Sequence, residues 1–270
     1  MEFAAEKGLF VGSAPDTFLS PEFQTVRKLI DEGAIGKVIN VTANYVGPGA
    51  DLWHPNAGFL YKQGGGPALD MGPYFLTTLV SMLGPIDSIF CYANRGWDVR
   101  DIHGQGVDVD VMTNYCAVLK FASGTVGNVN LTYDEWKSAL PGMELYGTEG
   151  VIIAPDPNTM MGPIKLLKAD EFKVLVNGKT DMGGKLAAIY GPESNGLFNE
   201  IDTVAPRIGN ERGAGLADMA KAIVEGRSPR VSADLCRHVT EAINAFNVCV
   251  ETGMPYKMTT SFEKPAAMKF

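Results

Sequence analysis

The segment MTNYCAVLKFASGTVGNVNLTY, residues 112–133, holds two runs in which apolar and polar side chains alternate. The runs cover residues 112–121 and 125–133, and the short link Ala122-Ser123-Gly124 between them is typical of a turn. Alternation with a period of two predicts β-strands, so we expect an antiparallel hairpin here. The polar positions of the second run include Asn128 and Asn130. One face of the resulting sheet is therefore expected to be either wet or a subunit interface.

More strands are expected on both sides of this hairpin, with helices before and after them. The expected strands cover residues 9–12, 38–46, 86–93, 143–146, 150–154, 164–167, 172–176 and 256–259. The expected helices cover residues 1–7, 20–32, 70–83, 211–225 and 232–251. Consecutive strands with helices grouped at either end predict an α+β fold, in which an open, mostly antiparallel sheet carries helices on one face.

Length and composition are those of a globular protein and exclude several functional classes. At roughly 150 residues per domain, 270 residues correspond to about 1.8 domains. The chain carries 31 acidic and 23 basic side chains, and its net charge of −8 disfavours binding to nucleic acid or to an anionic membrane. No apolar run reaches the roughly 18 residues that a membrane span needs. The acidic, amphipathic start is unlike a signal peptide.

The cysteines and histidines give no sign of a metal site or of a disulfide framework. Four cysteines occur without close pairing: Cys91, Cys116, Cys236 and Cys249. Free thiols of this kind are typical of a reducing compartment, so we expect a cytoplasmic protein. His103 lies near several aspartates that lack the regular spacing of metal ligands, and no metal is expected. His238 falls within an expected helix and is interpreted as a core histidine with satisfied hydrogen bonds.

The segment GGGPALDMGPY, residues 64–74, is the part of the chain richest in residues that could carry out chemistry. Glycines such as Gly65 and Gly66 allow the backbone to approach a ligand closely, so both are expected to contact substrate. Asp70 is expected at the start of a helix, and Tyr74 four residues later shares its face. The pair would lie at the positive end of the helix dipole, beside the glycine loop. A capping Asp70 and a packing Tyr74 are an equally good interpretation of the same pattern.

Two aromatic clusters elsewhere in the sequence are further candidates. Trp53 and His54 lie in the loop before the glycines, where an aromatic face and a polar tip suit a sugar-like substrate. His54 also rivals Tyr74 as the group that transfers a proton, because imidazole titrates near neutral pH. Tyr133 ends an expected strand, Trp136 follows it, and both are further candidates for binding substrate. A capped surface loop explains Trp53 and His54 about as well.

Asp16 and Thr17 are the candidates for contact with a cofactor. They follow the carboxyl end of the strand expected at residues 9–12, where ligands bind in open α/β sheets. The Asp-Thr dipeptide is equally typical of a turn.

Several segments, taken in their order and spacing, resemble the glucose–fructose oxidoreductase, inositol dehydrogenase and MocA (Gfo/Idh/MocA) family. GGGPALDMGPY resembles the glycine-rich Asp-x-Gly-x-His/Tyr segment of that family. The resemblance runs from about Leu9 to the C-terminus and includes these other segments: residues 14–18 (APDTF), 29–36 (LIDEGAIG), 53–56 (WHPN), 145–150 (LYGTEG) and 155–158 (PDPN).

The resemblance implies a C-terminal substrate domain whose open sheet forms the oligomer interface, here at residues 20–270. Residues 1–19 would be a remnant of an N-terminal Rossmann domain, a helix tail and its last strand. No strand–GxGxxG–helix segment for a dinucleotide is present. Glu263-Lys264-Pro265 is similar to the family's lysine motif but stands at the wrong place, so it is interpreted as surface charge.

The resemblance also implies a function and site residues. The chain would supply the substrate half of an oxidoreductase that transfers a hydride between NAD or NADP and a sugar, polyol or related compound. Asp70 and Tyr74 match the family's catalytic aspartate and histidine. Tyrosine at the histidine position titrates near 10 when free, and needs a neighbouring cation or strong hydrogen bond to act as a base. The alternatives are a non-catalytic binding and dimerisation domain, which needs a separate dinucleotide-binding chain, and a fragment of a longer protein.

Overall fold

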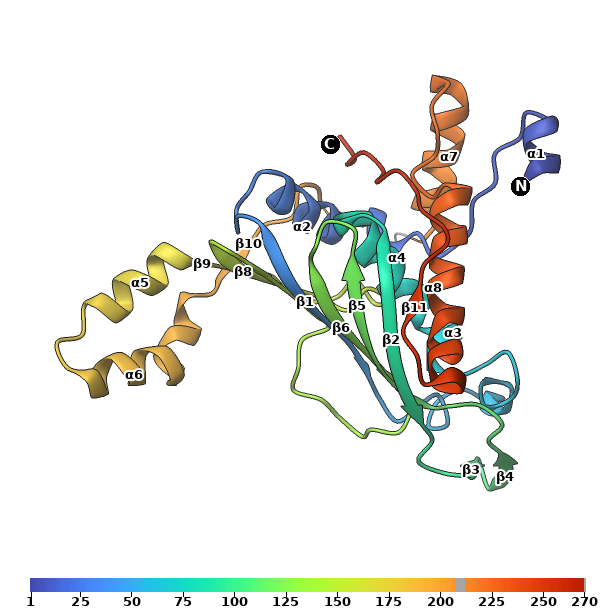
Figure 1. Ribbon diagram of the computed structural model, residues 1–270, viewed down its shortest axis with the longest axis horizontal. Coiled ribbons are helices and arrows are strands. Elements are labelled where there is room, and N and C mark those ends of the chain that lie inside the picture. The colour runs from blue at the N-terminus through green and yellow to red at the C-terminus, as the bar shows by residue number, and fades with distance from the viewer. Residues whose placement is uncertain (207–211, 270) are drawn as a thin grey trace.

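The computed structural model describes residues 1–206 and 212–269, and its centre is a nine-stranded sheet (Figure 1). The strand order is β10-β9-β8-β7-β1-β6-β5-β2-β11. Neighbouring strands are antiparallel except β1 and β6, which run parallel. The strands are β1 (Val38–Val46), β2 (Ile86–Asn94), β5 (Asn114–Phe121), β6 (Val126–Thr132), β7 (Met143–Gly147), β8 (Gly150–Ala154), β9 (Ile164–Lys168), β10 (Asn199–Ile201) and β11 (Tyr256–Lys257). A separate hairpin pairs β3 (Val99–Ile102) with β4 (Gln105–Asp108).

The helices that pack on the sheet lie on one of its faces (Figure 1). They are α2 (Pro21–Asp31), α3 (Pro67–Asp70), α4 (Gly72–Leu83) and α8 (Ala233–Thr252). The other helical elements are α1 (Glu2–Glu6), α5 (Ala169–Asn177), α6 (Met182–Tyr190), α7 (Ala214–Glu225) and the short 3₁₀ turns η1 (Thr17–Leu19), η2 (Ala57–Tyr61) and η3 (Pro192–Leu197). The mixed α/β fold with a mostly antiparallel sheet and helices on one face confirms the expected fold class.

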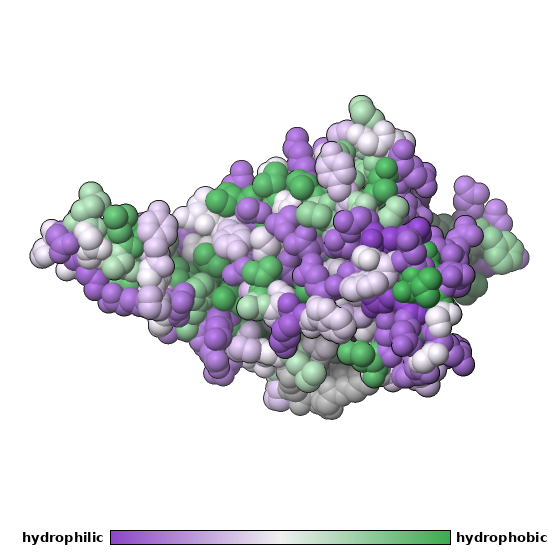
Figure 2. Space-filling view, turned by 90° about the horizontal axis from the view of Figure 1, so that it is seen from below, coloured by the Kyte–Doolittle hydropathy of each residue, from purple (hydrophilic) through white to green (hydrophobic). Residues whose placement is uncertain are grey.

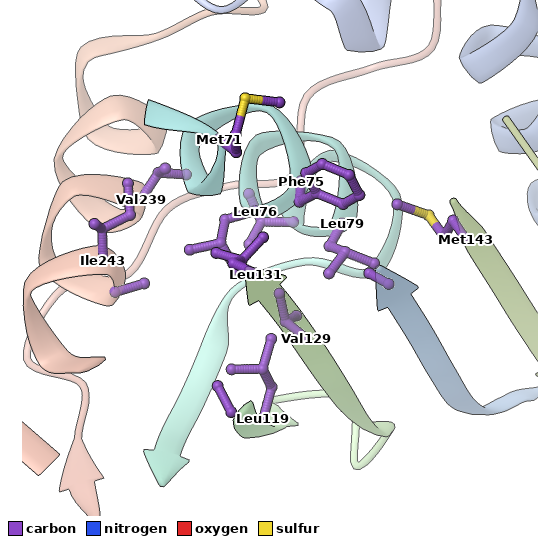
Figure 3. Packing of buried hydrophobic residues seen from close by; sticks show 14 of the residues in the cluster. Met71, Phe75, Leu76, Leu79, Leu119, Val129, Leu131, Met143, Val239 and Ile243 are labelled. Atoms are coloured by element: carbon purple, nitrogen blue, oxygen red, sulfur yellow. The ribbon is translucent and has the colours of Figure 1, made fainter. Parts of the chain in front are cut away.

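The core lies between α4, α8 and the inward face of the sheet. Leu76 and Leu79 of α4 meet Val129 and Leu131 of β6, and Ile243 of α8 closes the side (Figure 3). The first four of these side chains are fully buried. Burial of a leucine side chain contributes about 1.5–3 kcal/mol to folding, so this layer holds α4 in place on the sheet.

The helix expected at residues 70–83 is broken in two at Met71. Asp70 ends α3, and Gly72 begins α4. Pro73 has no N–H to donate to the carbonyl of Leu69, which interrupts the ladder of a continuous helix. Asp70 therefore precedes the N-terminus of α4 rather than lying in its first turn.

Two expected strands are wrong. Residues 9–12 form no strand, and Leu9 is 63% exposed, because no neighbouring strand among the described residues offers it a backbone ladder. Residues 172–176 belong to α5, whose first turn carries Asp170 and Glu171 where carboxylates stabilise a helix. The helix expected at 211–225 is α7, which starts at Ala214; Glu211 lies outside the described residues.

The second face of the sheet, which we call the open face, is not covered by α2, α4 or α8. Its middle positions are Thr42, Asn128 and Val118, neighbours across three strands, and Val118 is 54% exposed. The open face comprises Asn40, Thr42, Asn44, Ser88, Phe90, Tyr92, Cys116, Val118, Lys120, Val126, Asn128, Asn130, Glu144, Tyr146, Val151, Ile153, Lys165 and Leu167. Both outcomes of the sequence analysis, a wet face or an interface, stay predictions.

Candidate functional site

Asp70 is held by a buried tyrosine at the end of the sheet. The hydroxyl of Tyr133 donates a short hydrogen bond to Asp70 Oδ2. The Tyr133 ring packs edge-on against Tyr45 and Tyr61, with centroids 6.0 and 6.1 Å away. Burial and the neighbouring Asp70 raise the pKa of Tyr133 above its ordinary value, and the same causes raise the pKa of Tyr45 to about 12. Both phenols thus keep their protons, and Tyr133 fixes the orientation of the Asp70 carboxylate.

Tyr74 is held by an arginine that sequence analysis did not single out. Arg212 Nη1 donates to the Tyr74 hydroxyl oxygen over 3.1 Å, and its guanidinium carbon lies 5.3 Å from the centre of the Tyr74 ring. Arg212 Nη2 donates to the carbonyl and Oδ1 of Asn158, at 2.9 and 2.7 Å. Asn158 is thereby a brace that keeps the guanidinium against Tyr74.

The turn that carries Asn158 is organised by a half-buried carboxyl group. Asp156 Oδ1 accepts hydrogen bonds from the backbone N–H groups of Asn158 and Thr159, at 2.6 and 3.0 Å. Burial raises the pKa of Asp156, against the effect of these two donors. Local Asx geometry therefore positions the residue that braces Arg212.

A pocket of about 420 Å³ opens beside Tyr74 and Arg212. Its other lining residues are Gly12, Ser13, Ala14, Pro15, Asp16, Gly213, Gly215, Leu216, Met219 and Val231. Asp16 Oδ2 accepts the backbone N–H groups of Gly213 and Gly215, at 2.9 and 2.6 Å, and so caps the N-terminus of α7. The Asp16 carboxylate occupies the position that an anion would take at this helix end.

Thr17, next to Asp16, lies inside the protein. It is 2% exposed in η1, and its Oγ1 has no hydrogen-bond partner among the described residues. Contact between Asp16 or Thr17 and a cofactor stays a prediction.

Gly65 and Gly66 pack against the chain itself. A Cβ on Gly65 would lie 2.5 Å from the carbonyl oxygen of Leu60, and Gly66 has a φ of +86°. Gly66 N–H also donates to that carbonyl, at 2.6 Å. These contacts close the glycine loop onto η2, and contact of the two glycines with substrate stays a prediction.

Trp53 and His54 lie apart from this pocket. The Trp53 side chain is 73% exposed, and the His54 ring packs edge-on between Trp53 and Phe59, with centroids 5.5 and 5.6 Å away. His54 Nδ1 accepts the backbone N–H of Asn56 at 3.0 Å, so Nε2 is the ring nitrogen that donates. Neither residue lines the 420 Å³ pocket.

Trp136 lines a second hollow of about 310 Å³ with Trp97 and the buried Arg100. Arg100 forms ion pairs with Asp51 and Asp134, at 2.7 and 3.2 Å. Its Nη2 donates to the carbonyl of Tyr133 at 3.1 Å. Tyr133 therefore connects the two regions, since its hydroxyl serves Asp70 and its backbone anchors Arg100.

The structure thus brings Asp70 close to Tyr133 and places Tyr74 with Asp16. Tyr133 and Trp136 both line the second hollow, whereas Trp53 and His54 line neither it nor the 420 Å³ pocket. Arg212 lies 138 residues from Tyr74 in the chain, and no local motif marks it. A signal for Asn158 exists in the segment PDPN, which the family resemblance includes.

The described residues contain no cluster of three or more side chains suited to hold a metal ion. Among them, no helix is both long and apolar enough to cross a membrane. His238 is fully buried; its Nε2 accepts the N–H of Ile86 at 2.9 Å, and Nδ1 lies 2.9 Å from Thr260 Oγ1. This confirms its interpretation as a satisfied core histidine.

Comparison with known proteins gives one family and a set of similar folds. Residues 23–153 match the GFO/IDH/MocA C-terminal domain, a range that includes Asp70, Tyr74 and Tyr133. No curated protein matches the chain.

Solved structures with this fold include three dehydrogenases or oxidoreductases. A levoglucosan dehydrogenase in complex with NADH and L-sorbose aligns with a TM-score of 0.67 at 18% identity, over 90% of this chain and 64% of its own. An NAD-binding oxidoreductase from Klebsiella pneumoniae gives 0.73 at 14% identity, over 96% and 69%. The WlbA dehydrogenase from Bordetella pertussis, in complex with NADH and UDP-GlcNAcA, gives 0.63 at 14%, over 96% and 67%. The chain thus spans just under two thirds of the length of the levoglucosan dehydrogenase, and these likenesses concern the fold.

Proposed function

Residues 23–153 belong to the GFO/IDH/MocA C-terminal domain family, and from that premise we propose that this chain supplies the substrate half of an NAD(P)-dependent oxidoreductase. The substrate would be a sugar, a polyol or a related hydroxy or carbonyl compound. Solved proteins of similar fold were captured with NADH together with L-sorbose or UDP-GlcNAcA, which supports this class. A dinucleotide, when bound, would supply hydride chemistry, and the residues of this chain would handle the proton on the substrate oxygen.

Tyr74 is the proposed proton-transfer group. Its oxygen accepts a hydrogen bond from Arg212, which leaves the phenolic O–H to donate toward the pocket. In the reduction direction this O–H would give its proton to the carbonyl oxygen and leave a phenolate beside the Arg212 guanidinium, and in the oxidation direction that phenolate would take the proton of the substrate hydroxyl. Asp70, oriented by Tyr133, would position the substrate hydroxyl. The contact of Arg212 with Tyr74 on the pocket wall is the observation that carries this proposal.

The described residues do not fit the phosphates of a dinucleotide. The N-terminus of α7 beside the pocket is capped by the Asp16 carboxylate, which would repel a phosphate. We therefore propose that the dinucleotide is held by residues outside this chain, that the chain alone is inactive, and that it works in the cytoplasm as a homo-oligomer paired through the open face.

Calorimetry with NADH tests the proposal that the dinucleotide is held by residues outside this chain. We expect no saturable binding to this chain alone, and tight binding would overturn it. Turnover should require a separate dinucleotide-binding chain, assayed with L-sorbose and levoglucosan as probes. In that assay Tyr74→Phe should lower kcat by a factor of about 10²–10⁴, the usual contribution of general acid–base catalysis.

Matched variants separate the rival proton donors. His54→Gln should leave kcat within a few-fold if Tyr74 is the donor, whereas a collapse of kcat in His54→Gln but not in Tyr74→Phe would transfer the role to His54. Arg212→Lys retains a cation beside Tyr74 and should be milder than Arg212→Gln.

A non-catalytic binding and dimerisation domain is the second candidate. The absence of a phosphate seat among the described residues favours it. Turnover with no probe, with or without a dinucleotide-binding chain, combined with a stable homo-oligomer, would establish this candidate instead.

A further inference from the structure

The segment α5–α6–η3, residues 169–198, projects from the edge of the sheet as a separate arm (Figure 1). In the chain it lies between β9 and β10, which are antiparallel neighbours that a tight turn could join. The segment therefore adds about 30 residues that the sheet does not need for its topology.

The arm buries very little of its own apolar surface. No residue of α5 is buried, and Ala188 is the one buried residue of α6. Val174 is 73%, Met182 71% and Tyr190 82% exposed. Isolated helices shorter than about 12–15 residues are marginal in water, so two nine-residue helices of this kind need a surface to cover their apolar side chains. Hydrophobic residues lie exposed among hydrophilic ones on the projecting end, as Figure 2 shows.

The arm is continuous with the open face of the sheet. A groove of about 320 Å³ runs between them, with Val151 and Leu167 from the sheet on one side and Ala169 and Phe172 from the arm on the other. Leu167 is only 8% exposed although it belongs to the open face. The arm thus forms a wall at one edge of the open face, and the two surfaces together make a concave seat.

The net charges of the arm and of the open face indicate which molecule docks there. The whole chain carries −8 and repels its own copies, whereas the arm has four carboxylates (Asp170, Glu171, Asp181 and Glu193) against three lysines (Lys173, Lys179 and Lys185). The open face carries Lys120 and Lys165 against Glu144. The arm is therefore near −1 and the open face near +1, so that these two surfaces can meet across two copies without the repulsion that the rest of the chain would cause.

We infer that the arm docks on a second copy of this chain, where its apolar side chains cover the open face. The inference rests on the homo-oligomer proposed above and adds the element that holds it. In a two-fold assembly each arm would reach the partner's sheet, so every favourable contact is made twice.

Removal of the arm is the direct test. Residues 169–198 are replaced by the dipeptide Asn-Gly. Leu166 pairs with Asn199, so the new connection between these two residues is four residues long: Leu167, Lys168 and the inserted Asn-Gly. Sedimentation velocity should show the unaltered chain as a dimer or larger and the armless chain with a dissociation constant at least 100-fold higher. An armless chain that assembles as tightly as the unaltered one overturns the inference.

Point variants keep the test decisive if the armless chain does not fold. Val174→Glu with Tyr190→Glu changes only exposed arm residues and should weaken association at least ten-fold. Val224→Glu, at an 87% exposed position of α7, is the matched control and should leave it unchanged. Equal weakening by the control would overturn the role of the arm.

Asn128→Lys in the open face separates this inference from the proposed homo-oligomer. Dissociation by Asn128→Lys but not by the arm variants retains the open-face assembly and overturns the arm. An unaltered chain that stays monomeric at all concentrations overturns both.

Discussion

The body of the sheet and the projecting arm are stabilised in different ways. In the body, polar groups such as Arg100 and His238 have their partners inside the chain, and apolar side chains such as Leu79 are fully buried. In the arm, residues such as Leu186 are half exposed and the helices contact little besides each other. The arm therefore adds little to folding, and the docking proposed above would cover its apolar side chains. Changes in the body should therefore cost stability, and changes in the arm should not.

Loss of the buried ion network should be the largest effect. Arg100→Leu leaves Asp51 and Asp134, whose side chains are 10% exposed, without their shared cation. We expect the free energy of unfolding to fall by about 3–5 kcal/mol, measured by denaturant unfolding. The control Arg95→Leu breaks an exposed pair with Asp98 and should cost about 1 kcal/mol or less. Equal costs would show that the network does not distinguish the body.

A cavity in the core should come next. Leu79→Ala removes buried methyl groups between α4 and the sheet and should cost about 2–5 kcal/mol. The same measurement on Met82→Leu, which keeps the volume at another buried position of α4, should show less than about 1.5 kcal/mol. A small loss for Leu79→Ala would mean that α4 is packed more loosely than its burial indicates.

Acidification should act on the body through His238. Burial lowers the pKa of His238 below its ordinary 6.5, so the unfolded chain takes up a proton that the folded chain refuses. Stability from this group is present above about pH 6.5 and is lost as the pH falls from there toward the folded-state pKa, by at most about 1.4 kcal/mol per pH unit. Unfolding at pH 7.5, 6.5 and 5.5 should show this slope, and His238→Gln should remove it. An identical slope in the variant would assign it to other groups.

The arm should give the smallest effect. Leu186→Ala should change the free energy of unfolding by less than about 0.5 kcal/mol when measured at a concentration where the chain is monomeric. A cost like that of Leu79→Ala would show that the arm folds as part of the cooperative core.

Alternation and capping residues made much of the fold predictable. The pattern of residues 38–46 gives the bounds of β1 as found, and Ser20 caps α2 as its position before Pro21 indicates. One detail departs from strict alternation: a bulge between Val38 and Asn40 turns Ile39 outward, where it is 48% exposed. The strands that pair with β1 decide where such a bulge lies, so the sequence of β1 alone does not predict it.

The failures share a cause in tertiary contacts. Residues 172–176 (FKVLV) are β-branched enough to suggest a strand, but no sheet neighbour is offered to them beyond Lys168, and the carboxylates before them favour a helix. The polar hairpin β3–β4 and helix α6 carry no strong period and were not predicted. In the site, Asp70 and Tyr74 were predicted as a pair, yet each is held by a residue distant in sequence, Tyr133 or Arg212. Local spacing cannot encode such contacts.

The single parallel pair, β1 with β6, also has a consequence for synthesis of the chain. β1 ends at Val46, but its two neighbours end at Thr132 and Gly147. A ribosome that adds about 5–20 residues per second leaves the finished β1 without a complete set of neighbours for some 5–20 s. During that interval its backbone is an unpaired edge, and chaperones that shield nascent strands would find their target there. The centre of the sheet therefore closes only when β7 is complete, and the outer strands β8, β9, β10 and β11 are added after it.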